Sequence, residues 1–220
     1  GNCRMVQHLF FSQHLERWTY LGPFIEGDIY TAPGEDGAVP YFWPIGDKHI
    51  LIFASHQRGA QYLLGDYDKV HHRFKPSAHG RFNFGQIGAG GVHAPSATPD
   101  GRGGVYVIYN INNGKPTQGW NHIMSLVRQL SLNPDKLKIE PLPAVQGLLS
   151  SHRSVRETLL PANQETRLAG IEGNVVELNL EIDPQGATTG YARIARGGSW
   201  LNFPAALRTS VRLPFAETGQ

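Results

Sequence analysis

The sequence predicts an all-β chain, and three observations carry that prediction. Charged residues form only 17% of the 220 residues, while 26 Gly and 15 Pro favour many turns over long helices. Short apolar runs recur between turn-forming residues over the first two thirds of the chain. The clearest alternation of apolar and polar residues follows, within residues 174–197. Short strands separated by turns are typical of a β-sandwich or a β-propeller.

Strand-like runs occur at five places before residue 150. Residues 49–55 (HILIFAS) are almost continuously apolar, and a second apolar run follows after a turn that contains Gly59. Residues 122–133 fit an amphipathic helix by pattern alone, but Ser, Val and Leu alternate well enough for a strand. We therefore expect strands over 7–12, 49–55, 60–68 and 104–111, and a hairpin over 122–141 that turns at 133–135.

The character of the chain changes near residue 150. A polar connection leads to an alternating segment in which Val176, Leu178, Leu180 and Ile182 share one face, and Glu177, Asn179, Glu181 and Asp183 share the other. A sheet with one apolar and one polar face is typical of a sandwich. We therefore expect one domain over residues 1–150 and a second over residues 151–220.

The charge and cysteine content exclude several classes of protein. The net charge of +2 comes from scattered Lys and Arg, so the basic patch of a nucleic-acid-binding protein is not expected. The single cysteine, Cys3, has no internal disulfide partner, and no Cys/His spacing predicts a zinc site. No apolar run approaches the roughly 20 residues of a membrane span. Because the first residues lack both an initiating Met and a signal-peptide pattern, we expect further sequence before Gly1.

The stretch PGEDGAVPYFWPIG (residues 33–46) places two acids just before an aromatic run. Glu35 and Asp36 are candidates for acid/base chemistry if one of them has a raised pKa. Burial against the aromatic run would raise it by penalising the anion. The alternative is an ordinary acidic turn, in which Asp favours local backbone hydrogen bonds.

Five fragments, in order, resemble the sequence of a known family. They are LFFSQHLERWTYLGPF, VPYFWPIGDKHILIFASH, AQYLLGDYD, GGVHAPSATPDGRGGVYVIYNI and GWNHIMSLVRQLSL. The second resembles the segment that follows a Glu-Cys-Pro-Asp motif, and the fourth resembles an Asp-Phe-Tyr-Ala-Pro-Gln motif and its continuation. Together they resemble glycoside hydrolase family 32, the fructan-cleaving enzymes that include invertase, levanase and inulinase.

This resemblance implies a five-bladed β-propeller with the active site in its central funnel, joined to a β-sandwich. The chain then corresponds to the last two or so blades and the start of the sandwich. Enzymes of the family retain configuration with two carboxylates about 5 Å apart. The implied partner is sucrose or a fructan, and no cofactor is implied. Extracellular or periplasmic residence is common among enzymes that meet polymeric fructans.

The chain departs from the family pattern at the catalytic residues. Neither the nucleophile motif, Trp-Met-Asn-Asp-Pro-Asn-Gly, nor the Arg-Asp-Pro stabiliser motif occurs in the 220 residues. The acid/base glutamate belongs two residues before Pro40, where this chain has Ala38. Asp36 lies on the same face of an extended strand as Ala38, because side chains alternate with period two. Glu35 has the family's residue type but the opposite parity, which a bulge at a neighbouring glycine would correct.

Four further residues are candidates for binding the sugar. His93 takes the place of the Tyr in the family's Tyr-Ala-Pro, and Asn110 that of a Trp at a strand end; both can hydrogen-bond a fructosyl hydroxyl. Tyr62 offers a ring and a hydroxyl, and His56 lies near a strand end that could line the funnel. The alternative for each histidine is an ordinary core or surface residue.

Two functions follow as hypotheses. The first is a fragment of a retaining glycosidase for β-fructofuranosidic bonds, inactive alone because its nucleophile and stabiliser motifs are missing. The second is a non-catalytic carbohydrate-binding or scaffold propeller, which the replacement of Glu-Cys by Ala38 and Val39 supports.

Overall fold

The computed structural model describes residues 5–82, 91–111, 118–119, 122–134, 136–161, 164 and 166–170, together with the backbone of four later strands. The chain forms two compact units, Gly1–Gly147 and Leu148–Gln220. The described regular structure is β apart from a short 3-10 helix, η1 (Pro143–Leu148), which confirms the predicted all-β class.

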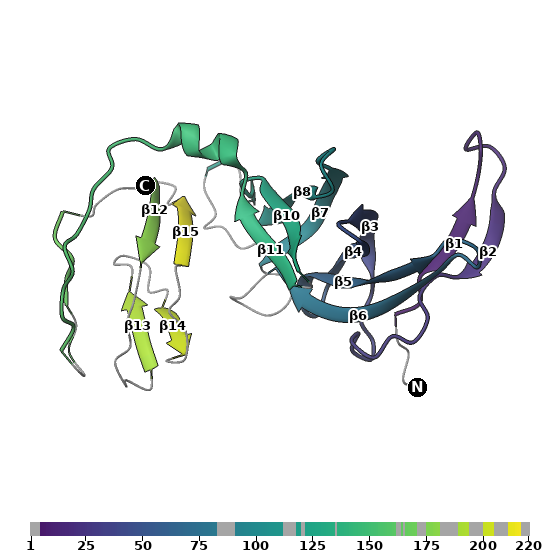
Figure 1. Ribbon diagram of the computed structural model, residues 1–220, viewed down its shortest axis with the longest axis horizontal. Coiled ribbons are helices and arrows are strands. Elements are labelled where there is room, and N and C mark those ends of the chain that lie inside the picture. The colour runs from purple at the N-terminus through teal and green to yellow at the C-terminus, as the bar shows by residue number, and fades with distance from the viewer. Residues whose placement is uncertain are drawn as a thin grey trace. The chain divides into compact units, whose positions relative to one another are not determined.

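The first unit contains a hairpin and two antiparallel sheets (Figure 1). The hairpin pairs β1 (His8–Phe11) with β2 (Thr19–Pro23). The first sheet runs in order through β3 (Ala38–Ile45), β4 (Lys48–Ser55), β5 (Gly59–Asp68) and β6 (Arg73–Arg81). The second has the order β11 (Lys136–Pro141), β10 (Arg128–Asn133), β8 (Val105–Ile111) and β7 (Val92–Pro99), with β9 (Ile123–Met124) paired to β8.

Most expected strands are present, and the exceptions have physical causes. The run 122–133 is divided between β9 and β10, because Ser125 turns inward and exchanges hydrogen bonds with the backbone of Tyr109. Within the first unit, the strands that the pattern did not predict are β2, β3, β6 and β7, each of which contains proline, and β6 and β7 show why. Both are edge strands, and Pro76 and Pro95 lie at register shifts, where a missing N–H breaks no regular ladder.

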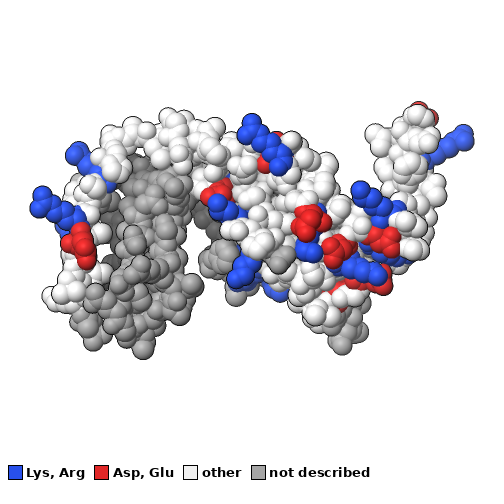
Figure 2. Space-filling model, in the orientation of Figure 1, with Lys and Arg blue, Asp and Glu red and all other residues white. Residues whose placement is uncertain are grey.

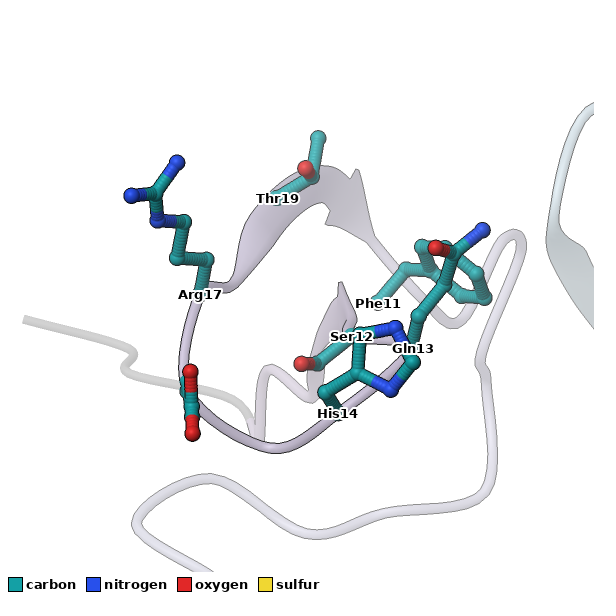
Figure 3. A pocket seen from close by; sticks show the side chains of 7 residues that line it. Phe11, Ser12, Gln13, His14, Arg17 and Thr19 are labelled. Carbon is teal, nitrogen blue, oxygen red and sulfur yellow. The ribbon is translucent and has the colours of Figure 1, made fainter.

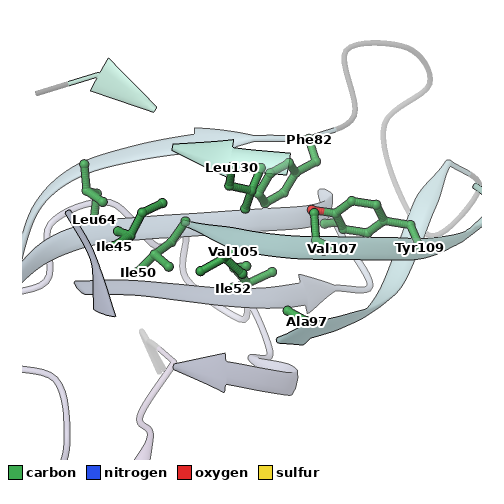
Figure 4. Close-up of a cluster of buried hydrophobic side chains, with 11 residues drawn as sticks. Ile45, Ile50, Ile52, Leu64, Phe82, Ala97, Val105, Val107, Tyr109 and Leu130 are labelled. Atoms are coloured by element: carbon green, nitrogen blue, oxygen red, sulfur yellow. The ribbon is translucent and has the colours of Figure 1, made fainter. Parts of the chain in front are cut away.

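The sheet β3–β6 is buried on both faces, which explains the nearly continuous apolar sequence of β4. Ile50 and Ile52 contribute to a cluster shared with β7, β8 and β10, in which side chains of the two sheets interdigitate (Figure 4). Leu51 and Phe53 point the other way and pack with Phe24 and other residues in a second cluster. Four-stranded antiparallel sheets packed face to face are the repeating units of a β-propeller.

The second unit contains two strand pairs, each antiparallel. One joins β12 (Val175–Leu180) to β15 (Val211–Ala216), and the other joins β13 (Thr189–Arg193) to β14 (Trp200–Pro204). The alternating segment therefore supplies strands to two pairs instead of folding back on itself. Ile182, Glu181 and Asp183 lie outside the described residues. The sandwich remains a prediction, as does the domain division at residue 150.

Charge and hydropathy add two observations. On the face shown in Figure 2, basic and acidic side chains are intermixed over the first unit. In the part of the chain that the structure describes, no helix is long and apolar enough to cross a membrane.

The close approach of β5 and β6 predicts an intolerant glycine. A Cβ at Gly65 would overlap the Lys75 carbonyl oxygen and lie 2.7 Å from Pro76 Cα, both backbone atoms that side-chain rotation cannot move. We expect Gly65→Ala to lower the free energy of unfolding by about 1–3 kcal/mol. Gly147 is the control, because a Cβ added there would meet nothing within 4 Å. Gly147→Ala is expected to change the free energy of unfolding by less than about 0.5 kcal/mol. Urea denaturation measures both, and equal stability of the two variants would contradict the prediction.

Candidate functional site

Two strained strand beginnings define the region where the predicted site residues meet. β3 has a register shift between Ala38 and Tyr41, and β7 has one between His93 and Ser96. Within each bulge a non-glycine residue has positive φ: 47° at Val39 and 44° at Ala94. A β-branched residue rarely adopts this conformation. Bulges redirect side chains, and such strain concentrates at functional sites.

Asp36 is bound to His56 through both carboxylate oxygens. Its Oδ1 accepts a hydrogen bond of 2.9 Å from the backbone N–H of His56, and its Oδ2 lies 2.6 Å from His56 Nδ1. The side chains are 44% and 67% exposed, respectively, so the pair is open to solvent. Partial burial raises the pKa of Asp36, but the hydrogen bonds from His56 outweigh it and the net pKa is lowered. Asp36 is therefore held as an anion.

His93 joins this pair from the neighbouring sheet. The His56 and His93 rings meet edge to face, with centroids 5.3 Å apart. His93 Nε2 is buried and has no hydrogen-bond partner within the described residues. Burial, and then the positive charge of His56, lower the pKa of His93, so its ring is neutral at neutral pH. Asn110 lies directly opposite His93 in the β7–β8 ladder. The structure thus brings together four of the six predicted residues.

Tyr62 has a different environment. It lies within β5, with its ring 5.2 Å from that of Phe82 and packed over Gly80, as part of the cluster between the two sheets. Burial raises the pKa of its hydroxyl. Its described contacts are therefore those of a core residue.

Glu35 points away from Asp36 into a buried polar network. Its side chain is fully buried and accepts hydrogen bonds from Arg58 Nε at 2.9 Å and from Ala32 N at 2.9 Å, and further bonds from Arg58 Nη2 and Gln61 Nε2. Burial alone would raise its pKa, but the hydrogen bonds, led by that of Arg58, bring the pKa to about 2. A general acid needs a pKa shifted in the opposite direction.

This network fixes the loop before β3. Arg58 Nη2 also donates to the carbonyl of Tyr30 at 3.1 Å, and Gln61 Oε1 accepts from His79 Nε2 at 2.8 Å. No sequence pattern singled out Arg58 or Gln61. Gln61 could have been found from the sequence, because a buried glutamine inside an apolar strand needs hydrogen-bond partners for its amide group. Here the side chain is fully buried, and both its amide nitrogen and its amide oxygen form hydrogen bonds.

The aromatic run of β3 serves the two cores. Phe42 packs edge to face against Phe24, with ring centroids 4.7 Å apart, and Trp43 donates from Nε1 to the Ala97 carbonyl at 3.2 Å. We expected an acid to be buried against these rings. Instead, Glu35 is buried against the polar side chains of Arg58 and Gln61.

A separate hollow of about 420 Å³ opens at the tip of the β1–β2 hairpin (Figure 3). It is lined by the loop between β1 and β2, including His14 and Arg17, and by the adjoining strand ends, but by none of the predicted site residues. No group of three or more His, Cys, Asp or Glu among the described residues could hold a metal ion.

Comparison with known proteins identifies the family. Residues 4–141 match the N-terminal domain of the glycosyl hydrolases of family 32. The chain belongs to glycoside hydrolase family 32. This membership confirms the predicted family and the propeller class of the first unit. No curated protein sequence matches the chain.

Solved structures share the fold at low sequence identity. The sucrose-6-phosphate hydrolase of Lactobacillus gasseri has a TM-score of 0.60 and 19% identity, over 97% of this chain and 46% of that one. A family 32 hydrolase of Bifidobacterium adolescentis has a TM-score of 0.57 and 17% identity, over 97% of this chain and 34% of that one. The β-fructofuranosidase of Bombyx mori has a TM-score of 0.54 and 19% identity, over 80% of this chain and 35% of that one. The chain spans less than half of each of these proteins.

The buried carboxylate predicts a large cost for a small change. Replacing Glu35 with Gln removes the counter-charge of the partly buried Arg58 and places an amide among hydrogen-bond donors, so we expect the free energy of unfolding to fall by about 2–3 kcal/mol. Glu26 forms an exposed pair with Lys75 at 3.5 Å, and Glu26→Gln is expected to cost less than about 0.5 kcal/mol. Urea denaturation of both variants is the measurement. A similar cost for the two would show that the Glu35 network contributes little.

The same carboxylate predicts the direction of a pH effect. Its pKa is 4.5 by reference and about 2 in the folded chain, so its contribution is complete above about pH 4.5 and is lost as the pH falls towards 2. We expect the stability difference between the wild type and Glu35→Gln to shrink over this range. Urea denaturation of both proteins at steps from about pH 7 to about pH 3 measures this difference. A stability difference that grows on acidification would contradict the prediction.

Proposed function

We propose that this chain is part of a retaining glycosidase that hydrolyses β-fructofuranosidic bonds in sucrose or fructans. The observation that carries the proposal is the grouping of Asp36, His56, His93 and Asn110 beside Ala38, in a chain that belongs to family 32. A variant of the Bombyx mori enzyme was solved with sucrose bound. A fructosyl unit offers the hydroxyl groups that imidazole and amide side chains recognise.

The two neighbouring acids enter this proposal with different roles. Asp36 belongs to the proton-transfer site, because it contacts His56 and through it the neighbouring sheet. Glu35 acts through the fold, since its ion pair with Arg58 fixes the loop that carries Asp36. His93 and Asn110 contact sugar hydroxyls, and Tyr62 supports them from the core. The nucleophile and the stabiliser, whose motifs are not among the 220 residues, are supplied by other parts of the enzyme.

A non-catalytic carbohydrate-binding propeller is the second candidate. It is favoured by Ala38, which cannot transfer a proton, and by the lowered pKa of both Glu35 and Asp36. Such a protein would bind sucrose or fructans without cleaving them.

Hydrolysis assays separate the two functions. We expect the 220-residue chain to release no fructose from sucrose, inulin or levan, because removing one member of a catalytic set costs orders of magnitude in rate. A longer protein that includes the nucleophile and stabiliser motifs is expected to hydrolyse at least one of them. Binding without hydrolysis by that protein would favour the second function, and hydrolysis by the chain alone would contradict the assignment of the nucleophile.

A further inference from the structure

The Asp36–His56 pair leaves one ring nitrogen of an exposed histidine outside its hydrogen bonds. Asp36 is an anion and can only accept hydrogen bonds, so His56 Nδ1 carries the hydrogen that lies between them. The backbone N–H of His56 occupies the other carboxylate oxygen, which fixes the two residues relative to each other. The remaining ring nitrogen, Nε2, is then the atom that can contact a substrate. At 67% exposure, the His56 side chain is accessible to a substrate.

The position of this pair is that of the missing acid. Asp36 lies two residues before Ala38, the first residue of β3, and Ala38 pairs with Ala54 near the end of β4. His56 directly follows β4 and therefore stands beside the place where the family resemblance expects a glutamate. Both predicted carboxylates are already committed, Glu35 to Arg58 and Asp36 to His56. Among the described residues, His56 is the exposed group at this place that keeps a proton-transfer atom outside these hydrogen bonds.

We propose that His56 is the general acid/base of this site and that Asp36 is its positioning residue. The inference rests on the proposed glycosidase function. An aspartate that holds Nδ1–H orients the imidazole and stabilises its protonated form. His93, which is neutral and packs edge to face against His56, adds no second positive charge beside the imidazolium.

The steps balance with histidine in the acid/base role. Protonated His56 gives its Nε2 proton to the glycosidic oxygen as the bond from that oxygen to the anomeric carbon breaks. A carboxylate nucleophile forms a covalent bond to the same carbon. Neutral Nε2 then takes a proton from water as the water oxygen attacks that carbon and the carboxylate departs. His56 ends the cycle protonated, as it began.

A second Asp–His pair in this chain has the same hydrogen bonds as Asp36 and His56 but lies elsewhere. Asp68 accepts from the backbone N–H of His71 at 3.0 Å and lies 2.7 Å from His71 Nδ1. Asp68 ends β5 and His71 lies three residues later in the turn before β6, whereas His56 belongs to the turn between β4 and β5 at the other end of the sheet. The Asp68–His71 pair is thus a matched control with the same chemistry in a different place.

The test uses two substrates in the longer, active protein. For His56→Asn we expect kcat/KM on sucrose to fall about 100-fold or more. On an aryl β-fructofuranoside with a good leaving group, such as p-nitrophenyl, the first step needs no proton, so we expect a much smaller loss in kcat/KM. Asp36→Asn should show the same split between substrates, because it disturbs the imidazole. His71→Asn should leave both activities unchanged.

The outcomes are distinguishable from one another. Unchanged kcat/KM on sucrose in His56→Asn, or equal losses on the two substrates, would overturn the inference while the wild-type activity upholds the proposed function. No hydrolysis by the wild type would overturn both. Thermal unfolding of each variant checks that it is folded, and His56→Gln, which keeps a polar side chain of similar reach, repeats the test if His56→Asn is not.

Discussion

The ion pair between the buried carboxylate of Glu35 and the partly exposed Arg58 is the interaction on which the site depends. A carboxylate without solvent contact is stable only when its oxygens are satisfied, and here Arg58, Gln61 and the Ala32 N–H do so together. The ion pair joins the loop before β3 to the turn after β4. Because the next residue is Asp36, fixing Glu35 also fixes the direction in which Asp36 points.

The opposite directions of two adjacent acids give them separate tasks. Glu35 turns toward Gln61 of β5, on the face of the sheet that carries Leu63 and the second core cluster. Asp36 turns toward His56 and so toward β7 of the neighbouring sheet. One carboxylate therefore stabilises the loop while the other shapes an exposed site. The strained residues Val39 and Ala94 lie in the bulges on the two sides of that site.

Much of the fold could be predicted from the sequence because turns and apolar runs are local signals. The strand β4 is nearly all apolar, and the hairpin of β10 and β11 turns where Pro134 interrupts the pattern. The edge strands β6 and β7 were missed because proline weakens their pattern, and proline is tolerated on an edge strand or where the ladder is irregular. That property belongs to the completed sheet.

The sequence by itself determined the all-β class, the family and a short set of polar residues, because these depend on composition, order and residue type. Only the tertiary structure decided which of them meet. It placed His56 on Asp36, set His93 and Asn110 beside them, left Tyr62 in the core and buried Glu35 under Arg58. The physical reason is that hydrogen bonds between residues 20 or more apart arise from strand pairing and bulges, which reverse side-chain direction within one residue.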